Sequence, residues 1–562
     1  MEIQERYEQW VRETRDNAEL SAELAAIRGK DAEIEDRFYR ELEFGTAGLR
    51  GILGAGTNRM NVYTVGRATQ GYCDYLREAS DAPSVAIAHD SRHKSREFAE
   101  EAASIFAANG IRVHLYPKLM PTPCLSFAVR YFGCTGGINI TASHNPAAYN
   151  GYKVYGGDGC QITELAAKSI LGKIGATDCF TGVRRMPLAE ARAQGLVQDI
   201  GADCVEAYLT AIDGESLLPK DAPRELRIVY TPLNGAGISC VPDCLARNGF
   251  HNITIPASQR DPNGDFPTCP YPNPEIRQAL DEAIACAEKC GAEFVLATDP
   301  DCDRVGTAIR KDGEFRLITG NQMGVLLLDF ICRMKRERGT MPEHPVAVKT
   351  IVTTKLCERV ADYYGVELRN VLTGFKYIGE QIRGLEAHGE TARFLLGYEE
   401  SYGYLTCPQV RDKDAVNASL LICEMVCWYK NQGRSLLDGL EDIFARFGYY
   451  TDKVMSFTFE GAAGFETMQG IMKALRADPI REAAGFAVES CTDYLGDDTG
   501  LPKSNVMQYH LTGGTVATVR PSGTEPKLKV YLSVCGATRG ESESTVAILS
   551  DFFTKWIDAH RN

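Results

Sequence analysis

Short apolar segments typical of strands alternate with longer segments typical of helices along most of this chain, and this alternation constrains the fold more than any other feature. It occurs in three blocks, with short turns between the segments. Such alternation is typical of parallel or mixed sheets whose faces are covered by helices. The predicted segments are Ser84–His89, Glu97–Asn109 and Arg112–Tyr116; then Leu226–Tyr230, Gly235–Asn248, Asn252–Ile255, Pro274–Cys290 and Glu293–Ala297; and then Val346–Thr350, Leu356–Tyr364, Glu367–Val371 and Phe375–Arg383.

The two ends of the chain have other patterns. Residues 1–40 are rich in Glu, Arg and Ala, with apolar side chains at near-helical spacing, which predicts amphipathic helices packed on the domain after them. From about Gly448 onward, strand-like and helix-like runs indicate a small α+β domain. These runs are Lys453–Phe459, Met468–Ala477, Thr515–Val519 and Glu543–Trp556.

A chain of 562 residues is too long for a single hydrophobic core. We therefore expect an α/β protein of four domains: three related mixed α/β domains and a smaller C-terminal α+β domain. The expected borders are 1–210, which includes the helical N-terminal extension, then 211–315, 316–447 and 448–562.

The charge balance excludes several classes of partner. The net charge is −14, so the surface repels nucleic acid and anionic membrane, and we expect neither as a partner. The N-terminus lacks an apolar signal core, and no stretch of about 18 apolar residues occurs, so we expect a cytoplasmic protein. The 19 cysteines contain no C-x-x-C pair, which favours reduced thiols over a metal or redox site.

The most informative motif is the run Gly137–Pro146, in which an apolar strand leads into Thr141-Ala142-Ser143-His144-Asn145-Pro146. The strand end fixes the serine, and the Asn-Pro pair stops the chain from continuing regularly. Lys153 returns toward the same region. A lone serine would be structural far more often than not, but Ser, His and Lys around one turn indicate a functional site.

A second motif places three alternating carboxylates at the end of an apolar strand: Asp299-Pro300-Asp301-Cys302-Asp303-Arg304. Three hard oxygen ligands around one point suit Mg²⁺, and carboxylates this close repel one another unless a cation holds them. An EF-hand fits poorly, because Arg304 and Arg310 stand where that loop needs Gly and Glu.

Two further motifs offer groups for a sugar and for a phosphate. Glu399 and Ser401 lie between glycines and can hydrogen-bond hydroxyls. Arg520, Ser522, Gly523 and Thr524 come after a strand-like run, where an arginine fork, hydroxyls and backbone N–H groups form a cradle for phosphate. The glycine-rich run Phe44–Gly51 contains Thr46 and Arg50, which indicate a second phosphate-binding site more weakly. No Walker A sequence or dinucleotide fingerprint is present.

With these four motifs in this order, the chain resembles the α-D-phosphohexomutase superfamily over essentially its whole length. Phe44–Gly51, Thr373–Gly379 and the helical N-terminal extension are similar to its long phosphoglucomutase/phosphopentomutase branch. The resemblance implies four domains around a central cleft. It also implies interconversion of glucose 1-phosphate and glucose 6-phosphate through a phosphoserine and a bisphosphate intermediate.

The resemblance implies a role for each motif residue. Ser143 is the phosphorylated nucleophile and, with Asp299, Asp301 and Asp303, a Mg²⁺ ligand, while Arg304 supports the metal loop. His144 and Lys153 are candidates for proton transfer, and Arg50 steadies the phosphoryl group. The expected phosphosugar contacts are Thr46, Lys376, Glu399, Ser401, Lys413, Arg520, Ser522, Gly523 and Thr524. Glucose 1,6-bisphosphate is the expected activator.

Several alternatives stay open at this point. Within the superfamily they are a phosphopentomutase acting on ribose or deoxyribose phosphates and a phosphomannomutase. Tyr402-Gly403 stands where the bacterial phosphomannomutase branch has a sugar-contacting histidine, which argues against mannose. A phosphatase with an aspartyl nucleophile fits poorly, because Asp303 stands where its pattern needs Thr or Val. A non-catalytic phosphosugar-binding protein would have a damaged serine or metal loop, and both are intact.

Overall fold

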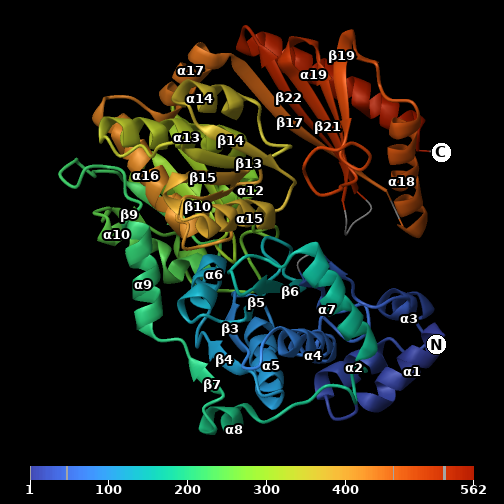
Figure 1. The fold of residues 1–562 in the computed structure, drawn as a ribbon. Helices are drawn as coiled ribbons and strands as arrows, with labels where there is room; N and C mark the ends of the chain where they lie inside the picture. The colour runs from blue at the N-terminus through green and yellow to red at the C-terminus, as the bar shows by residue number, and fades with distance from the viewer. Residues whose placement is uncertain (1, 46–47, 460, 523–526, 562) are drawn as a thin grey trace. The chain divides into compact units, whose positions relative to one another are not determined.

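The computed structural model describes residues 2–45, 48–459, 461–522 and 527–561. The chain divides into two compact units, each described by itself below. The first unit comprises Met1–Ile318, Ile382–Ala387 and Gly403–Glu424, and the second Thr319–Gln381, His388–Tyr402 and Met425–Asn562. Figure 1 labels the helices and strands along the chain. Within the described part of the chain, no helix combines the length and the apolar character needed to cross a bilayer.

Three short helices open the first unit: α1 (Ile3–Glu13), α2 (Ala18–Ala26) and α3 (Asp31–Phe38). Their apolar faces form a small core of their own, in which Trp10 contacts Phe38 and Phe180 edge to face. The prediction of amphipathic helices over residues 1–40 is therefore confirmed.

A seven-stranded mixed sheet comes next, in the order β1-β2-β6-β5-β3-β4-β7. Strands β5, β3, β4 and β7 run parallel, and β6, β2 and β1 extend the sheet by antiparallel pairing. The strands are β1 (Phe44–Gly45), β2 (Gly48–Ile52), β3 (Ser84–His89), β4 (Arg112–Leu115), β5 (Gly136–Ile140), β6 (Tyr149–Gly156) and β7 (Val197–Asp199). The helices are α4 (Val62–Ala79), α5 (Ser95–Ala108), α6 (Thr122–Tyr131), α7 (Glu164–Ala176), α8 (Leu188–Ala193) and α9 (Ala202–Asp213).

The second sheet of this unit has the order β12-β11-β10-β8-β9. Strands β8, β9 and β10 are parallel, while β11 and β12 form an antiparallel hairpin at one edge. The elements are β8 (Ile228–Thr231), η1 (Ala236–Ser239), α10 (Val241–Arg247), β9 (Ile253–Thr254), α11 (Ala257–Arg260), α12 (Arg277–Cys290), β10 (Phe294–Thr298), β11 (Val305–Lys311) and β12 (Glu314–Ile318).

The second unit begins with another α/β domain, in which β13 lies between β14 and β15 and is parallel to both. The elements of this part of the chain are α13 (Gly320–Glu337), β13 (Val346–Thr350), α14 (Leu356–Tyr364), β14 (Glu367–Val371), α15 (Phe375–Ala387), η2 (Thr391–Arg393), β15 (Phe394–Glu399), β16 (Gly403–Leu405), α16 (Ala415–Asn431) and α17 (Leu436–Phe447). Strand β16 and the residues up to Glu424 belong to the first unit.

The C-terminal domain is an antiparallel sheet in the order β17-β22-β21-β20-β19-β18. Helices α18 (Gly461–Ala477) and α19 (Arg539–Ala559) contribute Met468, Ile471 and Phe553 to its apolar core. The strands are β17 (Tyr449–Thr458), β18 (Glu482–Ala483), β19 (Phe486–Asp493), β20 (Met507–Leu511), β21 (Thr515–Pro521) and β22 (Lys527–Gly536), and η3 is Thr512–Gly514.

The predicted fold class, three related α/β domains and a smaller α+β domain, is confirmed. The predicted borders at residues 210, 315 and 447 stay predictions. One element prediction is wrong: Gly235–Asn248 is not a single helix. Cys240 has φ −134°, which interrupts helical geometry, so a 3₁₀ turn and the separate helix α10 replace it.

A buried lysine in the second unit, Lys349, should make the free energy of unfolding depend on pH. Lys349 at the end of β13 is 0% exposed, and burial, together with the nearby ammonium of Lys355, lowers its pKa to about 8. Glu358, 3.5 Å away, offsets only part of this effect. Between about pH 8 and 10.4 the unfolded chain binds more protons at this lysine than the folded chain, so this residue's contribution to stability rises with pH.

We expect Lys349→Met to remove that rise. The wild-type free energy of unfolding, relative to the variant, should increase between pH 7.5 and 10.5 by at most about 3 kcal/mol. The measurement is urea unfolding followed by circular dichroism under reducing conditions, with the exposed Lys473→Met as the matched control. Parallel pH profiles of wild type and Lys349→Met would contradict the prediction.

Candidate functional site

Ser143 lies in the loop between the parallel strand β5 and the antiparallel strand β6. Its backbone is in the left-handed region, with φ 52°, and its N–H donates to Thr141 Oγ1 over 2.8 Å. The left-handed region is uncommon for a residue with a side chain, so the surroundings must hold this turn in place. The side chain is almost fully buried, with 3% of the residue exposed.

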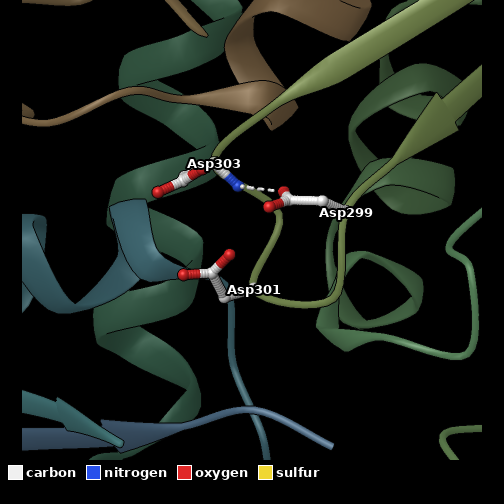
Figure 2. Close-up of side chains that lie close together, drawn as sticks. All are labelled: Asp299, Asp301 and Asp303. Atoms are coloured by element: carbon white, nitrogen blue, oxygen red, sulfur yellow. Dashed lines mark hydrogen bonds between the residues drawn. The ribbon is translucent and has the colours of Figure 1, made fainter. Parts of the chain in front are cut away.

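The three aspartates of the second motif lie in the loop between β10 and β11, within the same unit. Figure 2 shows Asp299, Asp301 and Asp303 around one point. One carboxylate oxygen from each lies within 4.8 Å of the others, and all three residues are buried. Asp299 Oδ1 accepts the N–H groups of Asp303 and Arg304, each at 3.0 Å, which closes the loop.

The donor set fits a divalent cation. One oxygen each of Asp301 and Asp303 is buried without a hydrogen-bond partner among the described residues. Orphaned buried carboxylate oxygens are costly, and hard oxygen ligands are what Mg²⁺ prefers. Among the described residues this is the one cluster of His, Cys, Asp and Glu side chains with a spacing that suits a metal. The sequence prediction that the three carboxylates converge is confirmed.

Ser143, the nucleophile expected from the sequence, contacts this cluster. Ser143 Oγ donates to Asp299 Oδ2 over 2.8 Å and lies 3.1 Å from Nδ1 of His144. The hydroxyl that the sequence singled out therefore adjoins the carboxylates that the sequence assigned to a metal, although 156 residues separate Ser143 from Asp299.

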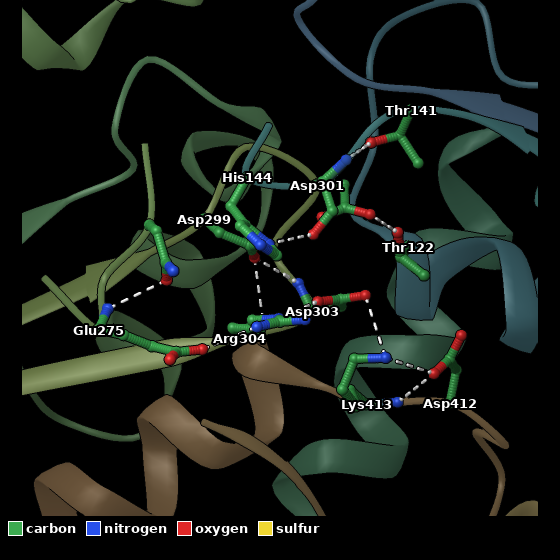
Figure 3. A network of polar contacts seen from close by, with 12 residues as sticks. Thr122, Thr141, His144, Glu275, Asp299, Asp301, Asp303, Arg304, Asp412 and Lys413 are labelled. Atoms are coloured by element: carbon green, nitrogen blue, oxygen red, sulfur yellow. Dashed lines mark hydrogen bonds and ion pairs between the residues drawn. The ribbon is translucent and has the colours of Figure 1, made fainter. Parts of the chain in front are cut away.

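Cations balance the carboxylates, as Figure 3 shows in part. Lys153 Nζ lies 2.7 Å from Asp301 Oδ2 and 3.0 Å from Asp303 Oδ2, and Lys413 Nζ lies 3.3 Å from Asp303 Oδ2. An acidic chain thus gathers positive charge locally, as binding a phosphate requires.

The pKa values result from this arrangement. Burial, and then the negative charges of Asp301 and Asp303, raise the pKa of Asp299 well above its ordinary value. Burial also opposes ionisation of Asp303, but Lys153, Lys413 and Arg304 outweigh it and lower its pKa. Burial would lower the pKa of Lys153, yet Asp301 and Asp303 raise it, so this lysine is an ammonium.

His144 is in a different electrostatic environment. Burial, and then the guanidinium groups of Arg304 and Arg50, lower its pKa well below the ordinary value. The imidazole is therefore neutral near pH 7 and is able to accept a proton.

Two of the arginines predicted as site residues, Arg304 and Arg50, also lie in this unit. Arg304 Nη1 donates to Glu275 Oε1 over 2.8 Å, which anchors the loop of the three aspartates, the candidate metal loop, to the chain before α12. Arg50 on β2 donates to Asn145 Oδ1 over 3.0 Å, so it contacts the serine loop through its side chain. Neither contact by itself tests the predicted roles.

Sequence reasoning missed two residues that hold the site together. Thr122 Oγ1 donates to Asp301 Oδ2 over 2.8 Å, and its N–H donates to the Asp301 carbonyl. Asp412 accepts from Lys413 Nζ at 3.1 Å and from Tyr155 Oη at 2.7 Å, and so holds Lys413 toward Asp303. Thr122 carries no signal in the sequence, whereas Asp412 lies in a run of four charged residues that a surface segment would equally explain.

Among the other predicted contacts, Lys376, Glu399, Ser401, Arg520 and Ser522 lie in the second unit. Glu399 Oε1 accepts the N–H of Gly374 over 2.9 Å, which links the end of β15 to the turn before Lys376. Gly320 packs closely against the backbone of Glu400: a Cβ at position 320 would lie 1.9 Å from the Glu400 carbonyl oxygen. Lys376 is buried beside the ring of Tyr377, with Nζ 4.9 Å from the ring centre, and Ser401 lies in the turn after β15.

The predicted phosphate cradle is described only in part. Arg520 is the last residue but one of β21, before Pro521, and the Ser522 N–H donates to the Lys527 carbonyl over 2.7 Å. Thr46, Gly523 and Thr524 lie outside the described residues. The roles of all these residues in binding stay predictions.

Known proteins are similar to this chain over most of its length. The chain matches the phosphoglucomutase/phosphomannomutase family: alpha/beta/alpha domain I over residues 41–178, domain II over 206–313 and domain III over 319–447. The phosphoglucomutase of Staphylococcus epidermidis is 38% identical over 514 residues, which cover 89% of this chain and 92% of that protein. The phosphoglucomutase of Staphylococcus haemolyticus is 39% identical over 517 residues, covering 89% and 91%.

A solved structure shares the fold. The exocytosis-sensitive phosphoprotein pp63/parafusin, a phosphoglucomutase from Paramecium in an open form, superposes with a TM-score of 0.67 at 18% identity. The match covers 93% of this chain and 95% of that chain.

The geometry of the carboxylate cluster predicts the effect of removing one ligand charge. We expect Asp301→Asn to raise the Mg²⁺ concentration at half-maximal activity at least about tenfold, because one anionic oxygen is lost from a buried set of three. The measurement is a Mg²⁺ titration of activity together with direct Mn²⁺ binding by electron paramagnetic resonance. Asp312→Asn, an exposed carboxylate in the β11–β12 turn, is the matched control. An unchanged Mg²⁺ titration in Asp301→Asn would show that the metal lies elsewhere.

Proposed function

The chain belongs to the phosphoglucomutase/phosphomannomutase family, and on that premise we propose that it interconverts glucose 1-phosphate and glucose 6-phosphate through a phosphoserine at Ser143. The observation that carries the proposal is the 2.8 Å contact between Ser143 Oγ and Asp299, within a buried cluster of three carboxylates. A hydroxyl adjoining a candidate metal site is the arrangement that phosphoryl transfer from a serine requires.

Asp299, Asp301 and Asp303 would hold Mg²⁺, with an oxygen of the phosphorylated Ser143 next to it. When bound, Mg²⁺ withdraws charge from the phosphoryl group and stabilises the serine oxygen as it leaves. The residues around it supply positioning and further positive charge, from Lys153, Lys413 and Arg304.

The proposed reaction has two transfers. A free hydroxyl of the sugar monophosphate attacks the phosphorus on Ser143, the bond from phosphorus to the serine oxygen breaks, and a sugar bisphosphate forms. The bisphosphate then turns so that its other phosphate faces Ser143, and transfer back to the serine oxygen yields the isomer. The hydroxyl proton must leave in the first transfer, and the neutral imidazole of His144 is the candidate to take it. Lys153, the other candidate for proton transfer, is an ammonium and would donate a proton to an oxygen rather than accept one.

The contacts of the substrate are assigned on the same premise. Arg520, Ser522, Gly523 and Thr524 would bind the phosphate that is not being transferred, because an arginine fork and hydroxyls suit phosphate oxygens. Glu399 and Ser401 would bind sugar hydroxyls. Lys376, Lys413 and Thr46 would contact the phosphosugar, and Arg50 would steady the transferring group. Glucose 1,6-bisphosphate would serve as activator by phosphorylating Ser143, and the enzyme would work in the cytoplasm.

The choice of sugar is tested by initial rates on glucose 1-phosphate, deoxyribose 1-phosphate and mannose 1-phosphate at equal concentrations, with Mg²⁺ and a trace of glucose 1,6-bisphosphate. We expect the highest rate on glucose 1-phosphate, because the curated relatives that match most of the chain are named phosphoglucomutase. A preference for deoxyribose 1-phosphate would make the enzyme a phosphopentomutase instead. No mutase activity on any of the three would contradict the proposal.

The phosphoserine mechanism predicts the outcome of removing one oxygen atom. We expect Ser143→Ala to lower kcat at least about 10⁴-fold, because no other group can form the covalent intermediate. Phosphosugar binding, measured by isothermal titration calorimetry, should change less than about threefold, since no substrate contact is assigned to this hydroxyl.

Intact-protein mass after incubation with glucose 1,6-bisphosphate provides a second readout. One added phosphate is expected in the wild type and in the exposed control Ser258→Ala, and none in Ser143→Ala. Wild-type turnover by Ser143→Ala would exclude the mechanism.

A further inference from the structure

Arg92 is a buried arginine that contacts the serine loop and that the proposed chemistry does not use. Only 3% of the residue is exposed. Its guanidinium donates to backbone carbonyls of the loop that contains Ser143. The acceptors are Ser143 O at 2.6 Å, Pro146 O at 2.9 Å and Tyr149 O at 3.0 Å, together with Asn145 O.

These contacts explain how the loop keeps an uncommon conformation. Ser143 has φ 52°, and four carbonyl oxygens of one short loop point toward a single cation. Pro146 O also accepts the Tyr149 N–H over 3.0 Å. Loss of the guanidinium would nevertheless take a hydrogen-bond donor away from all four carbonyls, which is costly where they are shielded from water. The planar fork of arginine can serve several acceptors at once in fixed directions, whereas an ammonium cannot match the same geometry.

Arg92 is in turn held by its own loop and by the second sheet's domain. Asp90 Oδ2 lies 3.4 Å from Arg92 Nε, and Asp90 Oδ1 accepts the Arg92 N–H. The guanidinium carbon lies 5.0 Å from the ring centre of Phe266, a cation–π contact. Beside it, His93 Nε2 lies 2.7 Å from Asp265 Oδ1.

The segment Gly264–Phe266 lies so close to the backbone next to Arg92 that only a glycine fits at position 264. A Cβ on Gly264 would lie 2.7 Å from the backbone nitrogen of His93. The segment Gly264–Phe266 therefore packs directly on the backbone that positions Arg92. The metal loop belongs to the same domain as this segment, so one domain supplies both the carboxylates and the support of Arg92.

We propose that Arg92 is the positioning residue of the phosphoserine loop: it holds the carbonyls of Ser143–Tyr149 so that Ser143 Oγ stays in contact with Asp299. It contacts neither Asp299 nor the Ser143 side chain in the hydrogen bonds of the described residues, so it acts through the backbone. This inference rests on the proposed function, because it assigns a role in phosphoryl transfer through Ser143.

The test is Arg92→Lys, which keeps the charge and removes the fork. We expect kcat to fall about 10²-fold, because displacing a nucleophile by roughly 1 Å costs that much. KM for glucose 1-phosphate should change less than about threefold, because no substrate contact is lost. Phosphorylation of Ser143 by glucose 1,6-bisphosphate, followed by intact-protein mass, should slow in proportion to kcat.

Arg224→Lys is the matched control. Arg224 is a largely buried arginine of the same unit, and it too donates to four backbone carbonyls, of Leu218, Pro219, Lys220 and Ala222. Arg224 comes just before β8, and the metal loop comes just after β10. Because β8 and β10 are parallel, Arg224 and the metal loop lie toward opposite ends of the second sheet. Its variant should keep the wild-type kcat, KM and rate of Ser143 phosphorylation.

Phe266→Leu is a milder second variant, in case Arg92→Lys does not fold. It keeps an apolar side chain and removes the aromatic face, and we expect kcat to fall about three- to tenfold with KM unchanged. Wild-type kcat and phosphorylation rate in both variants would overturn the inference, as would a loss confined to KM. An inactive wild type would instead contradict the proposed function itself.

Discussion

Asp299, Asp301 and Asp303 are held with their ligand oxygens within 4.8 Å of one another in the interior, where water cannot screen their repulsion. Much of the first unit around them is arranged to make this possible. Lys153 and Lys413 bring positive charge from β6 and from the chain before α16, and Thr122 and two backbone N–H groups donate hydrogen bonds. A bound cation would complete the balance, which explains why buried oxygens of Asp301 and Asp303 remain without a hydrogen-bond partner among the described residues.

The position of Ser143, the proposed nucleophile, depends on the same cluster of aspartates. Ser143 can contact Asp299 only if its loop turns sharply after β5, and the left-handed backbone at Ser143 provides that turn. A strained turn persists only where its surroundings over-determine it. Here Thr141 Oγ1 accepts the N–H of Ser143, and Arg92 donates to its carbonyl oxygen. Both polar backbone groups of Ser143 are therefore held by hydrogen bonds. Rigid placement of a nucleophile matters for phosphoryl transfer because the protein contributes mainly position and charge.

The chain distributes the candidate groups between its two units. The serine, the metal-loop carboxylates, Lys153 and Lys413 lie in the first unit, and Lys376, Glu399, Ser401 and Arg520 in the second. Glu399 and Lys413 are close in sequence and yet belong to different units, because the chain crosses from one unit to the other after Tyr402. Motifs that are consecutive along a chain are therefore a poor guide to which groups share a compact unit.

The alternation of strand-like and helix-like segments predicted several elements correctly from the sequence. Ser84–His89, Val346–Thr350, Leu356–Tyr364 and Glu367–Val371 were predicted with their observed bounds. The edge hairpin β11–β12 was not predicted from the residues, because its two strands follow β10 antiparallel and with no helix between them, outside the strand-helix alternation on which the other predictions rested. The predicted single helix over Gly235–Asn248 was wrong because the local backbone at Cys240 departs from helical geometry, which composition does not reveal.

By itself, the sequence determined the candidates for the chemistry. An apolar strand delivering Ser143 into a turn, and another delivering three alternating aspartates, are local patterns, and the repulsion of adjacent carboxylates already implies a cation. Only the tertiary structure decided what these groups contact. Asp412 and Lys413 belong to a charged run typical of a solvated face, yet both are buried against the site, because Tyr155 and Asp303 meet them from distant parts of the chain. Arg92 carries no motif of its own: its importance comes from the carbonyls of residues 143–149 and from Phe266, which only folding brings together.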